Sequence, residues 1–365
     1  MTLDVFAQGP TFQVMEQART RERERPDASE AGVLPDWPLF GWADDIRPML
    51  RRAAADRIPA ALVTLVDVDG GGPRSPGAQM LFCESEAGGY LSGGCVEADV
   101  AIHARETLRD GAPRRLVYGR NGPWADIQLP CGSQISLLVE RLSPGEAAVT
   151  QLLALTDQRQ PALWRTDGAR RRAVIAAPDG AACAFDADPF ELRRLYLPTP
   201  RLLVVGGDPT ALAIAQLGLL AGFETHLIRP KGPQTPPPLA GLNYSRAEPD
   251  EAFAVLGLDA WTYVAVATHD WSDDQAAVRA ALPSAAIYVG VLGARRRLPE
   301  RLARLRAAGV DELALARLHA PIGLDLGGKA PWEVAVAVLG EIIATRTRAQ
   351  KQARHAIERA EADVK

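Results

Sequence analysis

Short apolar runs and segments of helical spacing alternate along the second half of the chain. The apolar runs fall at 201–205, 223–228, 262–267 and 287–289, and amphipathic segments fall at 210–221 and 332–348. Strands that alternate with helices are typical of a parallel, doubly wound sheet. The run Ser272-Asp273-Asp274-Gln275 has the form of a capping box, which predicts a further helix beginning at Ser272. We therefore expect an α/β domain over 200–348 and a C-terminal tail helix over 349–365.

The first half mixes the two patterns less regularly. A helix is expected near 44–56 and a second one directly after Cys95. Strands are expected at 61–68 and, from the strict alternation of apolar positions, at 135–139. A mixed α+β domain is therefore predicted over 39–142.

The remaining parts of the chain are expected to carry less structure. Residues 1–38 are charged and lack apolar periodicity, which is typical of a mobile arm. A connecting region is predicted over 143–199, with a helix and a hairpin around Asp179 and Gly180. The Pro-Thr-Pro segment at 198–200 is expected to be a linker.

The charge and hydropathy of the chain limit the classes of binding partner that are expected. The 365-residue chain has a net charge of −4, with 24% charged residues. No basic surface field is expected, so neither nucleic acid nor an anionic membrane is an expected partner. No apolar stretch is long enough to cross a bilayer, and the N-terminus lacks a signal-peptide pattern. A cytoplasmic location is therefore expected.

Two of the four cysteines are the first candidates for chemistry. Cys95 lies in Ser92-Gly93-Gly94-Cys95-Val96-Glu97, and Cys131 lies in Pro130-Cys131-Gly132-Ser133. With Cys95 at the N-cap or N1 of the expected helix, outward amides and the helix dipole would favour its thiolate. The alternative for each cysteine is a small buried side chain. For Cys83 and Cys183, which lie in apolar segments, we adopt this alternative.

Neither a disulfide nor a structural zinc site is expected. Thiols of a cytoplasmic protein stay reduced. The sequence has no C-x-x-C pair and no H-E-x-x-H motif, and its five histidines are scattered.

The glycine turn after the first apolar run departs from a dinucleotide fingerprint. Here G-x-G-x-x-G/A reads Gly206-Gly207-Asp208-Pro209-Thr210-Ala211, so an aspartate replaces the second glycine. Arg229 stands at the end of the second strand, where an acid is expected. These two departures argue against a binding site for a nicotinamide cofactor. A Rossmann-like scaffold whose turn only closes strand onto helix is the alternative interpretation.

Several motifs in the same order resemble the XdhC/CoxI family of molybdenum-hydroxylase accessory proteins. The motifs are Gly72-Pro73-Arg74-Ser75-Pro76-Gly77-Ala78-Gln79-Met80, Gly93-Gly94-Cys95-Val96-Glu97, Cys131-Gly132-Ser133, Thr268-His269-Asp270, Gly290-Val291-Leu292-Gly293-Ala294-Arg295 and His319-Ala320-Pro321-Ile322-Gly323-Leu324-Asp325. The resemblance covers roughly 40–142 and 200–346. Asp208, Pro209 and Arg229 depart from the family's G-x-G-H-V-A turn and acidic strand end.

The resemblance implies a chaperone for the molybdenum cofactor rather than an enzyme. Such a protein would bind molybdopterin or its dinucleotide form as cargo, protect it and support its sulfuration with a cysteine desulfurase. It would then deliver the cofactor to the large subunit of an apo molybdenum hydroxylase of the xanthine dehydrogenase kind. A molybdopterin nucleotidyltransferase is a further candidate partner, and a homodimer is compatible with the apolar helices.

The resemblance also implies a set of cofactor-binding residues. Cys95 and Cys131 are the candidate thiolate ligands of molybdenum, a metal suited to soft donors. Arg74 and the amides of Gly93 and Gly94 are the candidate holders of the cofactor phosphate. The other candidates belong to the same motifs or to the second domain: Glu97, Gly132, Gly206, Gly207, Arg229, His269 and Gly293.

Two other classes of function stay open from the residues alone. One is an NAD(P)-dependent oxidoreductase, favoured by the sheet pattern and opposed by Asp208. The other is a cysteine-based sulfur-transfer enzyme in which Cys95 carries a persulfide. That enzyme would need a base, and His103 is the candidate, about two helical turns along from Cys95.

Overall fold

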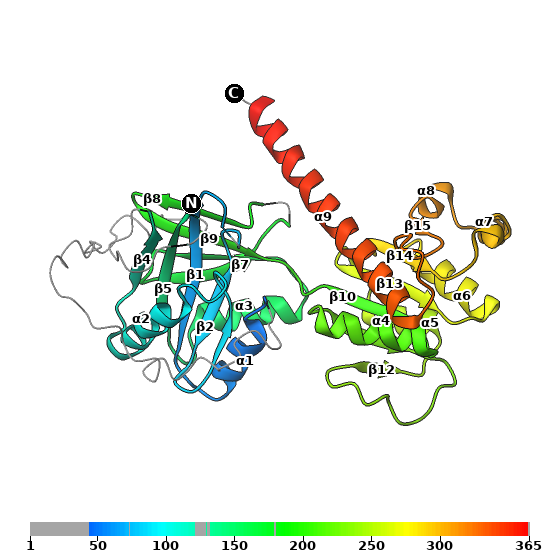
Figure 1. The fold of residues 1–365 in the computed structure, drawn as a ribbon, viewed down its shortest axis with the longest axis horizontal. Helices are drawn as coiled ribbons and strands as arrows, with labels where there is room; N and C mark the ends of the chain where they lie inside the picture. The colour runs from blue at the N-terminus through cyan, green and yellow to red at the C-terminus, as the bar shows by residue number, and fades with distance from the viewer. Residues whose placement is uncertain (1–43, 73, 121–128, 130–131, 179, 364–365) are drawn as a thin grey trace, which may run out of the picture. The chain divides into compact units, whose positions relative to one another are not determined.

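The chain forms two compact units, residues 1–198 and 199–365 (Figure 1). A computed structural model describes residues 44–363 except for 73, 121–128, 130–131 and 179, and it describes side chains as far as 348. The predicted arm over 1–38 lies outside the described residues. Each unit has its own hydrophobic core.

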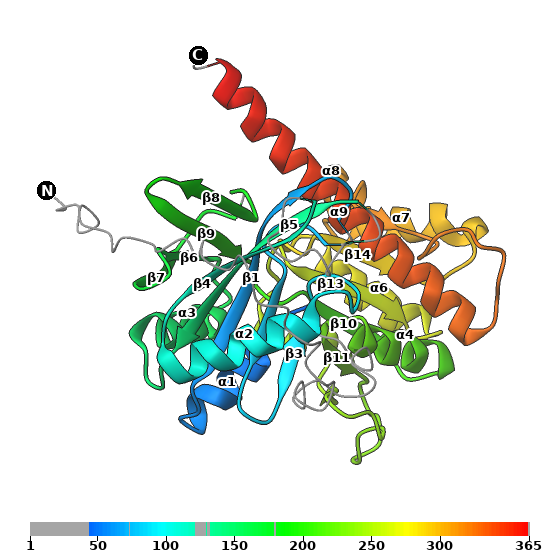
Figure 2. The same ribbon diagram turned by 60° about the vertical axis from the view of Figure 1, so that its left-hand side comes forward.

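A five-stranded antiparallel sheet is the centre of the first unit as described. Its strand order is β3-β2-β1-β5-β4. The strands are β1 (Ala60–Asp69), β2 (Gln79–Phe82), β3 (Ala87–Gly89), β4 (Arg114–Gly119) and β5 (Gln134–Leu142). Helix α2 (Glu97–Asp110) packs on one face of this sheet (Figure 2), where Val100 and Ala104 contribute to one core with Val63 and Leu65.

The opposite face of this sheet is covered as well. Helices α1 (Arg47–Ala55) and α3 (Ala147–Asp157) pack there, together with a second sheet. Within the described residues that sheet has the order β7-β6-β9-β8, from β6 (Ala162–Thr166), β7 (Arg171–Ile175), β8 (Cys183–Ala187) and β9 (Phe190–Tyr196). Because both faces of β1 are covered, its apolar run is continuous rather than alternating.

The predicted hairpin around Asp179 and Gly180 is wrong. The strands on either side of it, β7 and β8, are the two edges of the second sheet and do not pair with each other. The turn residues signal a change of direction, but the pairing is decided by β6 and β9, which lie between these edges.

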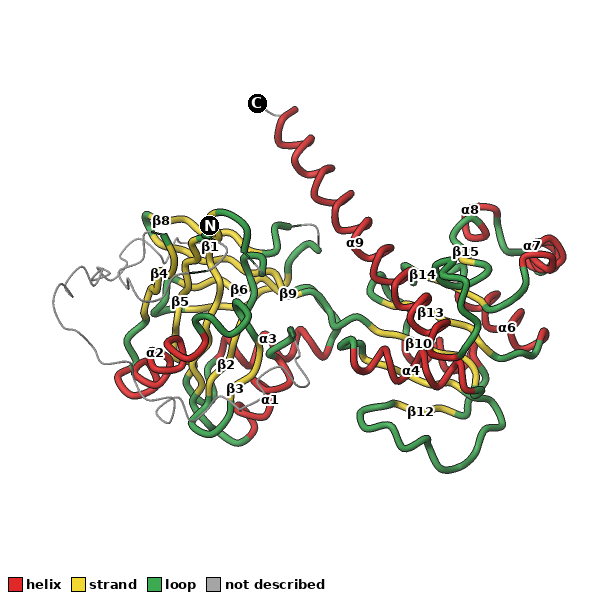
Figure 3. Tube along the Cα trace, in the orientation of Figure 1, coloured by secondary structure: helices red, strands yellow, loops and turns green. Residues whose placement is uncertain are grey.

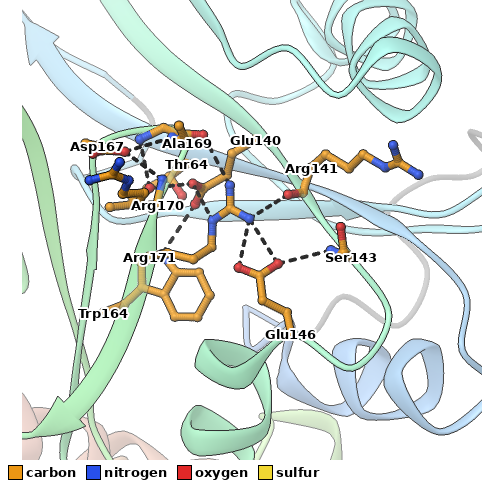
Figure 4. A network of polar contacts seen from close by, with 12 residues as sticks. Thr64, Glu140, Arg141, Ser143, Glu146, Trp164, Asp167, Ala169, Arg170 and Arg171 are labelled. Atoms are coloured by element: carbon orange, nitrogen blue, oxygen red, sulfur yellow. Dashed lines mark hydrogen bonds and ion pairs between the residues drawn. The ribbon is translucent and has the colours of Figure 1, made fainter. Parts of the chain in front are cut away.

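A buried ion pair links the two sheets of the first unit (Figure 4). Glu140 of β5 is fully buried and accepts hydrogen bonds from Thr166 Oγ1 (2.7 Å) and Trp164 Nε1 (3.3 Å). The Arg171 Nε donates to the same carboxylate (3.3 Å), while its Nη1 donates to Glu146 (2.9 Å). The carboxylate therefore connects β5 with β6 and β7.

The second unit is a parallel, doubly wound sheet, which confirms the predicted fold class (Figure 3). Its strand order among the described residues is β12-β11-β10-β13-β14-β15. The strands are β10 (Arg201–Gly206), β11 (Glu224–Ile228), β12 (Asn243–Ser245), β13 (Thr262–Ala267), β14 (Tyr288–Val291) and β15 (Leu318–His319). This is the order of a Rossmann fold.

Helices cover both faces of the parallel sheet. One face packs on α4 (Pro209–Leu220) and α9 (Pro331–Asp363), so the predicted tail helix continues α9 without a break. The other packs on α5 (Pro249–Leu256), α6 (Trp271–Ala281), α7 (Leu298–Ala307) and α8 (Glu312–Leu315), with a 3₁₀ turn η2 (Arg295–Arg297) before α7. Among the helices of the described residues, none is both long and apolar enough to span a membrane.

The predicted capping box at Ser272 is wrong. The helix α6 begins at Trp271, and Asp270 is its N-cap residue. The Asp270 carboxylate accepts hydrogen bonds from the amides of Ser272 (2.8 Å) and Asp273 (2.9 Å). An aspartate satisfies these amides as well as a serine would, so the helix starts earlier than the Ser-x-x-Gln pattern suggested.

We expect Glu140→Ala to lower the free energy of unfolding by about 3–5 kcal/mol, because Thr166, Trp164 and the Arg171 Nε would lose their buried acceptor. Urea denaturation followed by circular dichroism measures this change. The control is Glu86→Ala, which removes an exposed ion pair with Arg52 (3.1 Å) and should change stability by less than ~1 kcal/mol. Equal effects of the two substitutions would contradict this account of the link between the sheets.

Candidate functional site

One end of the five-stranded sheet gathers the loops that carry the candidate residues of the first unit. Strand β1 ends at Asp69, opposite Gln134 at the start of β5, and β4 ends beside the same residue. Strand β3 ends at Gly89, opposite Met80 near the start of β2. The loops after β1, β3 and β4 therefore all leave the sheet at this end. Arg74, Cys95 and Gly132 are thus brought to the same end of the sheet, which is called this edge below.

The loop before α2 is built around the carboxylate of Glu97. This side chain is 7% exposed and accepts the Ser92 amide at 2.7 Å. Its second oxygen accepts the Ser92 hydroxyl at 2.7 Å and the Gly94 amide at 3.0 Å. The buried residues on either side anchor the loop, so the tip from Gly93 to Cys95 is exposed on a fixed base.

Glu97 is ionised in this setting. Burial by itself would raise its pKa, but the hydrogen bonds from the Ser92 hydroxyl and the loop amides outweigh it and lower the pKa below 4.5. The negative charge stands in the first turn of α2, where the helix dipole also stabilises it. The structure therefore gives Glu97 the role of positioning the loop.

Cys95 lies outside the helix, one residue before the position we expected. The N-cap of α2 is Val96, and the Cys95 amide donates to Ser92 Oγ at 3.2 Å. Of the three cysteines that the structure describes, Cys95 is the exposed one. Its thiol is accessible because the loop, not the helix, carries it.

Glycine is required in this loop by backbone conformation. Gly93 and Gly94 have φ of +155° and +99°, and a Cβ at either would meet no atom within 4 Å. The Gly94 amide, which we predicted to face a cofactor, instead donates to Glu97. Among the described residues, no hydrogen-bond partner contacts the Gly93 amide, which keeps it available.

Arg74 is held beside the same loop. Its guanidinium lies 4.7 Å from the centre of the Tyr90 ring, and Tyr90 directly precedes the loop. An Nη atom of Arg74 also lies 2.6 Å from the Asp44 carboxylate, which is 70% exposed. An ion pair this exposed contributes little to stability, so Arg74 can exchange Asp44 for another anion at little cost.

Neither of the other two described cysteines is exposed. Cys131 lies outside the described residues; the next residue, Gly132, has φ of +67° and accepts a hydrogen bond from Arg120 (2.9 Å). Cys83 is buried, as predicted, and Cys183 is half-buried. Burial raises the pKa of Cys183 to about 11, so it stays a thiol at neutral pH. Within the described part of the chain, no group of three or more His, Cys, Asp and Glu side chains could hold a metal ion.

His103 is not placed to serve Cys95 as a base. Its Nδ1 lies 3.3 Å from Glu106 and its Nε2 lies 3.5 Å from Asp99, both on the same helix. Both ring nitrogens therefore face carboxylates of α2.

The second unit brings its candidates to the carboxyl edge of the parallel sheet. Asp208 is the N-cap of α4, accepting the Ala211 amide (2.9 Å), and its other oxygen lies 2.8 Å from His269 Nε2. Burial alone would raise the pKa of Asp208, but these partners lower it, so a negative charge occupies the start of α4. No sequence pattern indicates that His269 pairs with Asp208, because 61 positions separate them.

The glycines at this edge are explained largely by close packing. A Cβ at Gly206 would lie 2.1 Å from the Ala267 carbonyl oxygen, so β10 and β13 could not approach. A Cβ at Gly207 would lie 2.3 Å from Arg229 Cδ, which shows that the arginine crosses this turn. Gly293 lies over Arg301, whose Nη2 is 3.5 Å from the position of such a Cβ.

Comparison with known proteins gives the family of this chain. Residues 202–342 match the model of the XdhC Rossmann domain, and residues 53–119 match that of the XdhC and CoxI family. The molybdenum cofactor insertion chaperone PaoD of Escherichia coli (strain K12) is 30% identical over 307 residues, covering 83% of this chain and 89% of PaoD. The chain belongs to the XdhC and CoxI family. The resemblance drawn from the motifs is thereby confirmed.

Other similar proteins are more distant. A probable xanthine dehydrogenase subunit of Bacillus subtilis (strain 168) is 25% identical over 342 residues, covering 82% of this chain and 97% of that protein. The crystal structure of a xanthine dehydrogenase from Bacillus halodurans matches with a TM-score of 0.66 and 23% identity. The match covers 84% of this chain and 97% of that chain, and this likeness shows the fold.

We expect Glu97→Gln to lower the free energy of unfolding by about 1–3 kcal/mol and to expose the loop at 91–96 to proteases. An amide offers one acceptor oxygen where the carboxylate offers two, and its NH₂ would face the amides of the loop. Thermal unfolding and limited proteolysis with mass spectrometry measure both effects. The control is Glu84→Gln on an exposed glutamate, and a loop equally resistant in both variants would contradict the role of Glu97.

The stabilisation from Glu97 should also depend on pH. Because its folded pKa lies below its usual 4.5, the contribution is fully present above pH 4.5 and is lost as pH falls through the folded value. The difference in stability between wild type and Glu97→Gln, measured by urea denaturation from neutral to acidic pH, should shrink at the acidic end. A difference that grows on acidification would show that the carboxylate is not held ionised.

Proposed function

We propose that this protein is a chaperone for the molybdenum cofactor, which it holds as cargo and passes to an apo molybdenum hydroxylase. The observation that carries the proposal is the exposed Cys95 thiol on a loop fixed by the buried Glu97 carboxylate. The relative PaoD, named as a molybdenum cofactor insertion chaperone, supports the same role.

The chemistry of the edge suits this cargo. Molybdenum held by a dithiolene is a soft centre, and thiolates are soft donors. An exposed thiol on a fixed loop can contact the metal without rearrangement of the loop. The exposed position of the tip also suits a carrier, which has to release what it binds.

The phosphate end of the cofactor is assigned to Arg74 and the Gly93 amide. Both lie in loops at the same end of the sheet, and Tyr90 holds the guanidinium by a cation–π contact. Arginine binds phosphate through paired N–H groups. The exposed Asp44 would be exchanged for the phosphate, so the bound and free forms differ by one surface ion pair.

Cys131 is proposed as the second thiolate. The neighbouring Gly132 belongs to the segment that leads into β5 at the same edge as Cys95. Together with Cys95, Cys131 would offer the metal two soft donors.

Sulfuration and delivery belong to the same proposal. Because Cys95 lies at an exposed loop, a cofactor held there would be open to a cysteine desulfurase, the partner proposed to support its sulfuration. The large subunit of the apo hydroxylase would then compete for the metal and the phosphate together. These steps occur in the cytoplasm, and a molybdopterin nucleotidyltransferase is a candidate source of a dinucleotide form.

We expect Cys95→Ser to reduce the molybdenum that copurifies with the protein by about tenfold or more, because a hydroxyl is a poor ligand for a soft metal. The protein is purified without oxygen from a molybdenum-replete host, and metal analysis and pterin fluorescence after oxidation give the occupancy. Cys131→Ser should give a similar loss.

Cys183→Ala is the matched control, because this thiol is half-buried and protonated. It should retain cofactor at the wild-type level. Undiminished molybdenum and pterin in the Cys95→Ser, Cys131→Ser double variant would remove both thiols from the site and overturn the proposal.

A further inference from the structure

Three cationic residues gather at the carboxyl edge of β11 and β12. Arg229 directly follows β11 and Arg246 directly follows β12. The two strands are parallel, with Ile228 opposite Ser245, so both arginines leave the sheet at the same edge. The Arg229 amide donates to the Ser245 carbonyl at 2.9 Å, which fixes the two strand ends together.

Gly232 is the point at which the two arginines come together. The Arg229 Cδ lies 2.9 Å from where a Cβ of Gly232 would be, and Arg246 Nε donates to the Gly232 carbonyl at 2.8 Å. The turn between them places Lys231 at φ +55°, a left-handed conformation that costs lysine about 1–2 kcal/mol. A strained lysine beside two arginines concentrates positive charge at one exposed turn.

These charges have no carboxylate partner. In the described part of the chain, none of Arg229, Lys231 and Arg246 forms an ion pair with an acidic side chain. Other arginines of this unit do pair, as Arg201 does with Glu224 (3.1 Å) and Arg301 with Asp274 (3.1 Å). The cluster is therefore an unneutralised positive site within an acidic protein of net charge −4.

The position of the cluster is that of a ligand crevice. Arg229 crosses the turn after β10, with its Cδ and Nε each 2.3 Å from where a Cβ of Gly207 would lie. In doubly wound sheets, ligands bind outside the carboxyl ends of the strands, and an arginine near the end of the second strand can accept a ribose phosphate.

The start of α4, next to this cluster, is already occupied by the side chain of Asp208. In a dinucleotide site the diphosphate binds the first amides of the helix after the first strand. Here the Asp208 carboxylate accepts the Ala211 amide at 2.9 Å and pairs with His269 at 2.8 Å. A diphosphate at this helix start would meet a fixed negative charge, whereas the cluster at β11 and β12 stays open.

We propose that Arg229, Lys231 and Arg246 form a binding site for a phosphomonoester, and that the Asp208–His269 pair excludes a diphosphate from the adjoining helix start. A terminal phosphate carries about two negative charges at neutral pH and offers three acceptor oxygens, which matches two guanidinium groups and an ammonium. Such a monoester occurs on a nucleotide and also on a phosphorylated pterin, and the site's chemistry is the same for both.

Isothermal titration of the full chain tests the site with inorganic phosphate, adenosine 2′-monophosphate and NAD⁺, which contains a diphosphate but no monoester. Inorganic phosphate and adenosine 2′-monophosphate should both bind the wild type, and NAD⁺ should not. The Arg229→Gln, Arg246→Gln double variant should bind them about tenfold or more weakly, because each arginine supplies a charge-assisted hydrogen bond. Arg279→Gln, on an exposed arginine of α6, is the control and should bind as the wild type does.

Three results would overturn the proposal: no binding of inorganic phosphate or adenosine 2′-monophosphate to the wild type, equal affinity of the double variant for them, or NAD⁺ binding as tight as that of adenosine 2′-monophosphate. Both arginines are exposed, and a thermal melt checks that the double variant is folded. Molybdenum analysis of the same variant separates the two sources of the monoester. Loss of molybdenum together with phosphate affinity assigns this site to a phosphorylated pterin, in place of Arg74 and the Gly93 amide, and retained molybdenum assigns it to a nucleotide. The phosphate affinity itself does not depend on the outcome of the Cys95 experiment.

Discussion

The buried carboxylate of Glu97 holds together the part of the first unit on which its chemistry depends. Its two oxygens accept hydrogen bonds from amides and a hydroxyl of the loop that carries Cys95. Without these hydrogen bonds, two glycines with positive φ would leave the thiol of Cys95 free to move. The negative charge of Glu97 also lies in the first turn of α2, where it interacts favourably with the helix dipole.

The two units share one structural feature, which has a different consequence in each. In each, a carboxylate occupies the start of a helix: Glu97 at α2 and Asp208 at α4. At α2 the result is a fixed loop that presents a cysteine. At α4, the Asp208 carboxylate and His269 occupy the helix start, where the diphosphate of a dinucleotide site would bind. A helix start is therefore evidence of ligand binding only when its amides are free.

Membership of the XdhC and CoxI family fits this division of roles. The first unit offers a soft donor on an open edge, and the second keeps a Rossmann scaffold whose usual phosphate contact is altered. The proposed carrier of cofactor would benefit from few and exposed contacts, since each buried contact would slow release. The interior of the first unit is by contrast tightly fixed, with Glu140 and Arg171 joining its two sheets.

Much of this was determined by the sequence itself. Apolar runs that alternate with segments of helical spacing were enough to predict the parallel sheet. Its strands are buried on both faces, and its helices pack on strands that are near in sequence. The motifs around Cys95 and Gly293 were enough for the family. Tertiary structure alone decided what long-range pairs do: that Glu97 orders the loop, that Asp208 meets His269, and that β7 and β8 lie on opposite edges. Partners far apart along the chain leave no periodic signal, and they are chosen only when packing brings their elements together.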